Sequence, residues 1–381
     1  MPNDQPASQI PNLSYIREKI AGVDEDIVRL LNARANLSLQ VGEAKRVESQ
    51  NRGDDPKESQ VFVPGQEQLV FDRLGQVNQG PLPITALKAI YREVMSASIA
   101  LQRPVGVGYL GPRGTFTHAA ALKKFGEGVA YSPYPTIAAV FRALEAKEVT
   151  YAVVPAENSR AGSVQPTLDQ LISSPLRIRG ETYLPVEQCL LSNTTLASIR
   201  RIYSMPVAFE QSEKWLESNA SHVERVNCDS TAQAAEQASR DPEAAAVASA
   251  ICSEIYGLNI IARGIQDQRD NTTRFFILAP EVAPPSAADK SLLAFSVDHR
   301  QPGALCDALR CFKEHGVNLT NIASRPHGPR PWEYLFFVEC SGHSQAPPLS
   351  RVLDDMKAYC PEILILGSFP DQRPIPSRGG M

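Results

Sequence analysis

Long apolar runs, paired cysteines and an excess of positive charge are all missing from this sequence. No stretch approaches the ~18 apolar residues of a membrane span, and the polar start MPNDQPASQIPNL does not have the charged-then-apolar order of a secretory signal. The seven cysteines are scattered without a CxxC motif, which predicts reduced thiols in the cytoplasm instead of disulfides or a zinc site. The net charge of −4 gives no basic field for nucleic acid or membrane lipid, so an anionic ligand would need locally placed arginine and lysine.

The chain is long enough for several domains, and its texture changes twice. Residues 8–103 predict an all-helical domain. Residues 104–280 alternate between short strands and helices, which predicts an α/β domain with a mostly parallel sheet. After a Pro- and Ala-rich linker, residues 290–371 follow the order βαββαβ, which predicts a small antiparallel sheet with helices on one face.

Charged residues interrupt the apolar stripe of the first predicted helix. Arg34 and Lys45 lie on that stripe, about 16 Å apart along the axis, and could converge on a small polyanion. Ser98 and Gln102 are one turn apart on the last helix, and Arg17 could serve the same site or its mate in a dimer. The alternative is that these are solvated residues near helix ends or a buried salt bridge. Helices are predicted at 13–45, 66–79 and 84–103, with a polar loop at 49–60.

The segments IREKI, DEDIVRLLNARANL and VGEAK resemble the all-helical chorismate mutase of bifunctional chorismate mutase–prephenate dehydratases. The implied reaction rearranges chorismate to prephenate and needs no nucleophile, only a held conformer and donors on the ether oxygen. The family's P-x-R-E reads Pro64-Gly65-Gln66-Glu67 here, so one substrate arginine is replaced, and a region that only dimerises stays open. The resemblance implies carboxylate binding by Arg34 and a partner's Arg17, ether-oxygen contacts from Lys45 and Gln102, and further substrate contacts from Glu67 and Ser98.

Three polar segments punctuate the α/β region: GYLGPRGTFT (108–117), VPAENS (154–159) and DNTTRF (270–275). In the first, Thr115 and Thr117 sit at a glycine-rich turn that suits an anion. In the second, residues 157–159 should end a strand, where α/β sites form, or else cap a helix that begins near 164. In the third, Arg274 can bind a carboxylate bidentately or pair with an internal acid.

Together these segments resemble prephenate dehydratase. The resemblance implies two α/β lobes, like a periplasmic binding protein, with the site in the cleft and no metal or organic cofactor. Prephenate loses carbon dioxide and its ring hydroxide to give phenylpyruvate, and Thr273 would donate a hydrogen bond to the leaving oxygen. Asn158 and Ser159 would orient the substrate, and Arg274 would support the site. Departures from the family pattern, such as Gln188 where histidine is frequent, leave a prephenate decarboxylase as an alternative.

The C-terminal region carries two motifs that resemble the phenylalanine-binding segments of the ACT domain, Pro302–Leu305 and Ser324–Pro326. The first places backbone amides at a helix start, which suits a carboxylate. The whole chain is then predicted to be a bifunctional, phenylalanine-regulated enzyme that forms a homodimer or homotetramer. A plain dimerisation module and a non-catalytic phenylalanine sensor are the remaining alternatives. The effector residues implied are Gly303, Ala304, Leu305, Ser324, Arg325 and Pro326.

Overall fold

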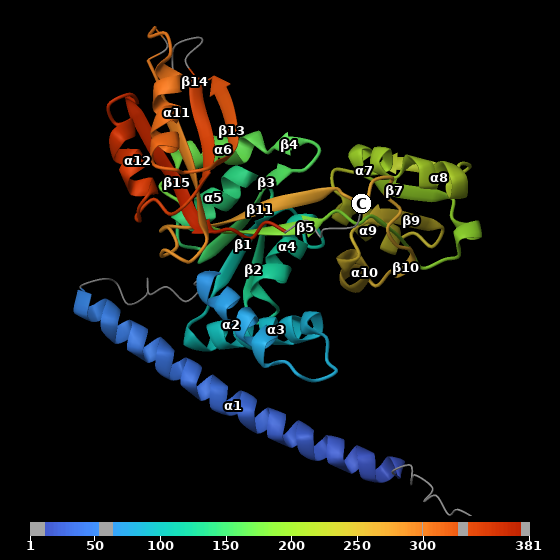
Figure 1. Ribbon diagram of the computed structural model, residues 1–381. Helices are drawn as coiled ribbons and strands as arrows, with labels where there is room; N and C mark the ends of the chain where they lie inside the picture. The colour runs from blue at the N-terminus through green and yellow to red at the C-terminus, as the bar shows by residue number, and fades with distance from the viewer. Residues whose placement is uncertain (1–11, 53–63, 299, 327–333, 375–381) are drawn as a thin grey trace, which may run out of the picture.

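A computed structural model describes residues 12–52, 64–298, 300–326 and 334–374 (Figure 1). Helices form the N-terminal end of the chain. Two α/β lobes follow, and a small C-terminal sheet with its own helices comes last. The start of the predicted region 8–103 and most of the predicted loop 49–60 lie outside the described residues. Among the described residues, no helix is both long and apolar enough to cross a membrane.

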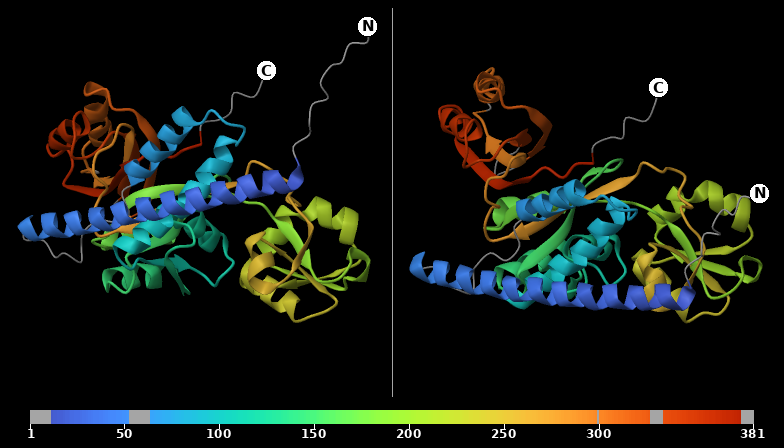
Figure 2. Two further views of the ribbon diagram at one scale, coloured as in Figure 1. Left: turned by 90° about the horizontal axis from the view of Figure 1, so that it is seen from below. Right: turned by 60° about the horizontal axis from the view of Figure 1, so that its bottom comes forward.

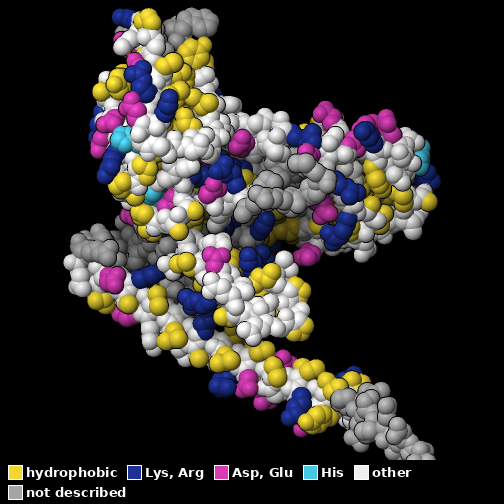
Figure 3. Space-filling model, viewed as in Figure 1, with side chains coloured by type: hydrophobic (Ala, Val, Ile, Leu, Met, Phe, Trp, Pro, Cys, Tyr) yellow, Lys and Arg dark blue, Asp and Glu magenta, His cyan; other side chains and the backbone are white. Residues whose placement is uncertain are grey.

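The N-terminal region is helical, as predicted, and consists of α1 (Leu13–Arg52), α2 (Pro64–Val77) and α3 (Ile84–Gln102). Helix α1 is longer than expected, because the polar residues after 45 continue the helix. It packs along α3 and runs as one rod down the side of the molecule (Figure 2). Its apolar stripe is not covered within the chain, since Ile20, Val23 and Leu30 are 54%, 57% and 60% exposed. Apolar side chains lie along this rod in Figure 3.

The middle of the chain forms two α/β lobes, as predicted, and the main strands of each lobe run mostly in one direction, with β11 reversed in the first lobe and β6 reversed in the second. Strands β1, β2 and β3 are parallel, and so are β7, β8 and β9. The chain passes between the lobes from β5 to β6 and from β10 to β11; β11 lies antiparallel to β3 and β5, and β6 lies antiparallel to β9 and β10. The lobe-one elements are β1 (Gly106–Leu110), α4 (Phe116–Phe125), β2 (Ala130–Tyr134), α5 (Ile137–Glu145), β3 (Tyr151–Asn158), β4 (Gly162–Ser163), α6 (Gln165–Ser173), β5 (Arg177–Pro185) and β11 (Thr272–Ala279).

The second lobe has a five-stranded sheet of order β10-β6-β9-β7-β8. Its strands are short and its core is rich in alanine, which lets α9 lie close against β9. Its elements are β6 (Cys189–Ser192), β7 (Arg201–Ser204), α7 (Pro206–Gln211), α8 (Glu213–Ala220), β8 (Glu224–Asn227), α9 (Thr231–Ser239), β9 (Ala244–Ala248), α10 (Ile251–Tyr256) and β10 (Asn259–Ala262), with a short 3-10 turn at Leu196–Ser198.

The C-terminal region follows the predicted βαββαβ order, with an antiparallel sheet and both helices packed on its core. Phe295, Phe312 and Met356 are buried between the sheet and the helices. All seven cysteines of the chain are unpaired, and five of them are buried. The elements are β12 (Asp289–Ser296), α11 (Ala304–Glu314), β13 (Leu319–Pro326), β14 (Tyr334–Ser341), α12 (Leu349–Met356) and β15 (Glu362–Pro370).

One feature of the fold has no counterpart in the sequence pattern: the C-terminal sheet continues into lobe one. Strand β15 pairs in parallel with β5 at Gly367 and Ile178, which gives a single sheet of order β13-β14-β12-β15-β5-β11-β3-β1-β2, with β4 beside β3. A Cβ atom at Gly367 would lie 2.4 Å from the Ile178 carbonyl oxygen. Only glycine therefore fits at this junction.

Candidate active sites

Two amides and a hydroxyl meet where β3 ends and β11 begins. Thr273 pairs with Asn158 across these antiparallel strands. The Asn158 Nδ2 donates to Thr273 Oγ1 at 3.1 Å and to Asn271 Oδ1 at 2.7 Å, and its Oδ1 accepts from the backbone N–H groups of Arg160 and Ala161 at 3.0 Å each. Because the Thr273 oxygen accepts from Asn158, its own O–H is left to donate elsewhere. The cluster therefore presents an oriented, polarised hydroxyl donor.

Ser159 fastens the two strand ends together. Its N–H donates to the Thr272 carbonyl at 2.9 Å, and its Oγ accepts from the Thr272 N–H at 3.0 Å and donates to the Asp270 carbonyl at 3.3 Å. These bonds hold the backbone beside Thr273 in place. The competing interpretation, a helix cap, is not what the structure shows, because α6 follows Val164 without a side-chain cap.

Arg274 lies on the opposite side of β11 from Thr273, because successive side chains of a strand alternate between faces. It is buried and pairs with Glu181 (Nε–Oε2 2.8 Å), with Glu157 (Nη1–Oε2 3.5 Å) and with Glu339. Burial alone would lower the pKa of Arg274, but Glu181 and Glu339 outweigh it and raise it. Of the two interpretations of Arg274, the structure shows the second, because the guanidinium pairs with internal acids.

Lys290 completes a buried ion network with these acids. Its Nζ lies 3.0 Å from Glu181 Oε1, 3.4 Å from Glu339 Oε1 and 3.5 Å from Asp371 Oδ1, and the lysine is 1% exposed. Glu181 is on β5, Lys290 on β12 and Glu339 on β14. The network therefore ties the strand that carries Thr273 to three strands, two of which belong to the C-terminal region.

The glycine-rich turn at 111–115 uses its polar groups internally. Thr115 Oγ1 accepts from the His118 N–H at 3.3 Å as the cap of α4, and the Gly114 N–H donates to His118 Nδ1 at 3.2 Å. Burial, and then Arg113, lowers the pKa of His118 to about 4, so this ring is a neutral acceptor at pH 7. The turn also meets the second lobe, since Tyr256 Oη donates to the Arg113 carbonyl at 2.8 Å. The anion-binding role expected for Thr115 is thus replaced by helix capping.

In the helical region the structure places three of the predicted residues, Arg34, Ser98 and Gln102, on the facing helices α1 and α3. Arg34 of α1 donates to Ser98 Oγ of α3 and, at 3.5 Å, to the Val94 carbonyl. Gly42 of α1 packs on Gln102 of α3, since a Cβ at Gly42 would lie 3.2 Å from the Gln102 Cβ. The Gln102 Oε1 is buried and has no hydrogen-bond partner among the described residues. A buried amide oxygen without a partner is unusual in a folded protein.

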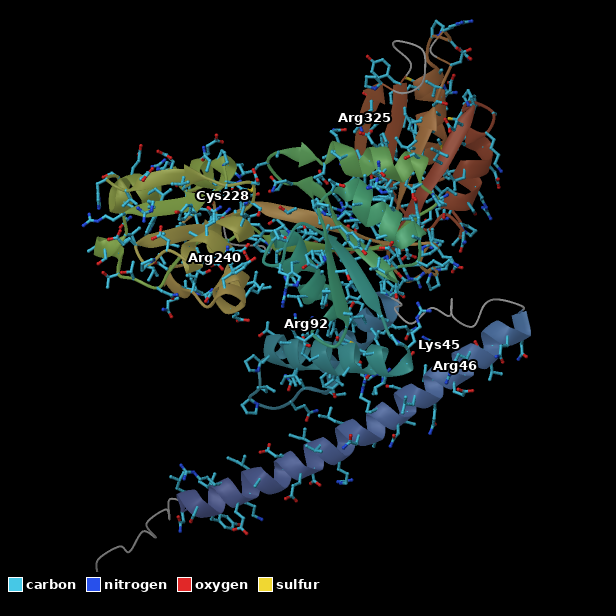
Figure 4. The ribbon with its side chains drawn as sticks, turned by 180° about the vertical axis from the view of Figure 1, so that it is seen from behind. Lys45, Arg46, Arg92, Cys228, Arg240 and Arg325 are labelled. Atoms are coloured by element: carbon cyan, nitrogen blue, oxygen red, sulfur yellow. The ribbon has the colours of Figure 1, made fainter. Side chains whose placement is uncertain are left out.

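Lys45 and Glu67 lie where the helices meet the first α/β lobe. Lys45 is half-buried on α1 (Figure 4), and burial, followed by the charge of Arg179, lowers its pKa. Glu67, in the first turn of α2, pairs with Lys124 of α4 (Oε2–Nζ 2.6 Å). Arg17 is exposed and lies 17 residues before Arg34 on the same helix, about 25 Å along its axis. A single chain does not bring Arg17 to the other residues.

The two C-terminal motifs occupy different places. Gly303 precedes α11 with φ +85°, a conformation that favours glycine, and Ala304 and Leu305 begin the helix. Ser324, Arg325 and Pro326 end β13. Arg325 pairs with Asp169 of α6 and donates to the Gln165 carbonyl at 3.3 Å, so this motif contacts lobe one (Figure 4).

Sequence reasoning missed several participants, among them Asn271, Lys124 and Glu181. Asn271 was inside the quoted DNTTRF segment, two residues before Thr273 and directly ahead of β11. Nothing local marks Lys124, or Glu181 as a partner of Arg274, because those contacts join residues 57 and 93 positions apart. No three His, Cys, Asp or Glu side chains of the described residues converge in a way that could hold a metal ion.

Comparison with known proteins agrees with this three-part arrangement. The family model for chorismate mutase type II matches residues 16–103, that for prephenate dehydratase matches 107–283, and that for the ACT domain matches 291–357. The bifunctional chorismate mutase/prephenate dehydratase of Aquifex aeolicus is 40% identical over 363 residues, 94% of this chain and 98% of the relative. The enzyme of the same name from Pseudomonas aeruginosa is 37% identical, over 94% of this chain and 97% of the relative.

Two solved structures each resemble 70% of this chain. Prephenate dehydratase from Arthrobacter aurescens in complex with L-Phe has a TM-score of 0.64 and 30% identity, covering 70% of this chain and 90% of that one. GqqA, described as a novel type of quorum quenching acylase, has a TM-score of 0.65 and 33% identity, covering 70% and 98%.

The fold and its sites define a multidomain protein in which a helical module, a two-lobed α/β unit and an ACT domain are joined in one chain. At 40% identity over 98% of the Aquifex aeolicus relative, the chain belongs to the bifunctional chorismate mutase/prephenate dehydratase family.

Proposed function

We propose that this chain converts chorismate to prephenate in residues 8–103 and prephenate to phenylpyruvate in residues 104–280, under control by L-phenylalanine bound in residues 290–371. The observation that carries the proposal is the Asn158–Thr273–Asn271 cluster, a preset hydroxyl donor in a chain closely related to bifunctional enzymes.

For the dehydratase reaction, Thr273 donates its O–H to the ring hydroxyl of prephenate as that group leaves. Loss of carbon dioxide and hydroxide makes the ring aromatic, so the enzyme has to stabilise charge on the departing oxygen. The Asn158 N–H fixes the direction of that donor. Arg274 supports the reaction indirectly. It is buried with Glu181 and Glu339, and it holds β11 in place instead of touching substrate.

For the mutase reaction, chorismate binds between α1 and α3. Arg34 binds a carboxylate, Lys45 donates to the breaking ether oxygen, and Ser98 and Glu67 contact the rest of the substrate. The lowered pKa of Lys45 strengthens it as a hydrogen-bond donor. Gln102 can donate to the same ether oxygen. Its Oε1 has no partner among the described residues, and rotation of the amide puts an N–H donor in its place.

A second copy of the chain completes the mutase site. The apolar residues along α1 are exposed, which is costly in water and is relieved when another α1 packs on them. The same packing brings a partner's Arg17 to the site that its own chain does not reach. We therefore propose a homodimer or homotetramer, and light scattering of the purified protein should give a mass at least twice that of one chain.

The activities are tested by feeding the purified protein chorismate or prephenate separately. Phenylpyruvate, measured by its absorbance in base and by mass, is the expected product of both. Prephenate that is consumed without phenylpyruvate would indicate the decarboxylase alternative, and a protein that turns over prephenate alone would have only the dehydratase. Binding of phenylalanine without turnover of either substrate would leave the sensor alternative.

For regulation, the motif residues Gly303, Ala304, Leu305, Ser324, Arg325 and Pro326 form the proposed effector site. Arg325 also holds Asp169 of α6, so a ligand that draws this arginine away loosens a contact between the ACT domain and lobe one. Phenylalanine is expected to lower the rate of phenylpyruvate formation, and R325M is expected to weaken that response. An unchanged phenylalanine response in R325M would remove Arg325 from the proposal.

A further inference from the structure

Lys124 is a buried cation near the end of α4, in the lobe that the prephenate dehydratase family model covers. It is 7% exposed, which is rare for lysine and requires charged or polar partners. One partner is Glu67 of α2, whose Oε2 lies 2.6 Å from Lys124 Nζ. Another is Gln372, whose Oε1 lies 3.2 Å away and which follows the last strand of the C-terminal region. A single lysine of the dehydratase lobe thus joins segments from both ends of the chain.

The place of Glu67 gives this contact its meaning. Glu67 lies in the range matched by the chorismate mutase model and is a proposed substrate contact, whereas Lys124 lies outside that range. Pro64, at the start of α2, is buried against Gly180 of β5, so α2 rests on lobe one at this point. The neighbouring Gln66 is exposed and uncharged. The carboxylate of Glu67 on α2 is therefore held by Lys124, a residue of the dehydratase lobe.

We propose that Lys124 is a positioning residue of the mutase site. It engages one carboxylate oxygen of Glu67, fixes the side-chain rotamer and leaves the second oxygen to accept a hydrogen bond from the substrate. A preset acceptor binds substrate without the ordering cost that a free glutamate would add. The mutase pocket is then complete only when the dehydratase lobe is docked on α2. This inference rests on the mutase activity proposed above.

The test is steady-state kinetics of the full-length protein with K124M, whose side chain has a similar length and no charge. The KM for chorismate should rise by about tenfold, as expected for losing a charge-assisted contact, while kcat changes much less. Phenylpyruvate formation from prephenate should be unchanged. The variant K124R should restore most of the affinity for chorismate.

Two controls separate positioning from general damage. K123M removes the adjacent lysine, which is exposed and donates to the Tyr183 carbonyl at 2.6 Å, and should leave both activities unchanged. E67Q should raise the KM by itself, and adding K124M to it should add little, because both changes act through one side chain.

The inference is overturned if K124M leaves the KM for chorismate unchanged, or if it lowers both activities and the unfolding midpoint together. It is also overturned if the effects of E67Q and K124M simply add. A wild-type protein that shows no mutase activity would instead refute the proposed function itself, so the two failures are distinguishable.

Discussion

The buried ion network gives the sharpest quantitative prediction, through the substitution Glu339→Gln. Glu339 is 4% exposed and pairs with Arg274, with Lys290 (Nζ–Oε1 3.4 Å) and with the Thr320 hydroxyl (3.0 Å). Glutamine has nearly the same shape but no charge. In the quartet of Arg274, Lys290, Glu181 and Glu339, the substitution leaves two buried cations with one buried carboxylate, that of Glu181.

The size of the effect follows from leaving a charge unpaired inside the protein. Breaking a buried ion pair by removing one partner costs about 3–5 kcal/mol of unfolding free energy. Glu157 and Asp371, whose side chains are 35% and 27% exposed, also approach these cations and compensate in part. We therefore expect a loss of about 3 kcal/mol, at the lower end of that range.

The measurement is urea unfolding of E339Q and of a matched surface control, E236Q. Glu236 pairs with Arg240 on the surface, with side chains 42% and 74% exposed, and its removal should cost below about 1 kcal/mol. Circular dichroism and enzymatic rates, followed together, report whether the C-terminal sheet and the dehydratase site are lost in one transition. If E339Q unfolds at the same urea concentration as E236Q, the network does not stabilise the junction as argued.

Three further predictions follow from particular contacts. Burial would raise the pKa of Glu339, but Arg274 and then Lys290 lower it below 4.5. The carboxylate therefore stabilises the fold above pH 4.5, and this contribution is lost as the pH falls through the lowered pKa. The difference in unfolding free energy between wild type and E339Q should shrink on acidification, and a constant difference would contradict this. T273A should reduce phenylpyruvate formation from prephenate by at least about a hundredfold and leave the mutase rate unchanged. K45A should reduce the mutase rate and leave phenylpyruvate formation from prephenate unchanged. Each rate is measured in its own assay, and a parallel loss of both in either variant would refute separate sites. G367A should weaken the junction of β15 with β5, because its methyl group would meet the Ile178 carbonyl, and an unchanged melting temperature would show that the strands part easily.

Local sequence was a good guide to the elements and to the Thr273 cluster. Asn158 ends a strand, as the run YAVVP predicted, and the antiparallel pairing of β3 with β11 brings it beside Thr273. The helical region was predicted with its boundaries within a few residues at most ends, because three- and four-residue apolar steps define a helix directly. The reversal of β11 and β6 was not predicted, since strand direction depends on how the chain crosses between lobes and not on composition.

What the sequence by itself determined is the order of helices and strands and the family motifs, because periodicity and short polar segments are local properties of the chain. Only the tertiary structure decided which way Arg274 points, that Lys124 meets Glu67, and that Gly367 joins two sheets into one. Each of these depends on groups far apart in sequence being buried together, and a buried charge takes whichever counter-charge the packing supplies. The same motif arginine can thus bind a ligand or brace a domain junction, and the fold makes that choice.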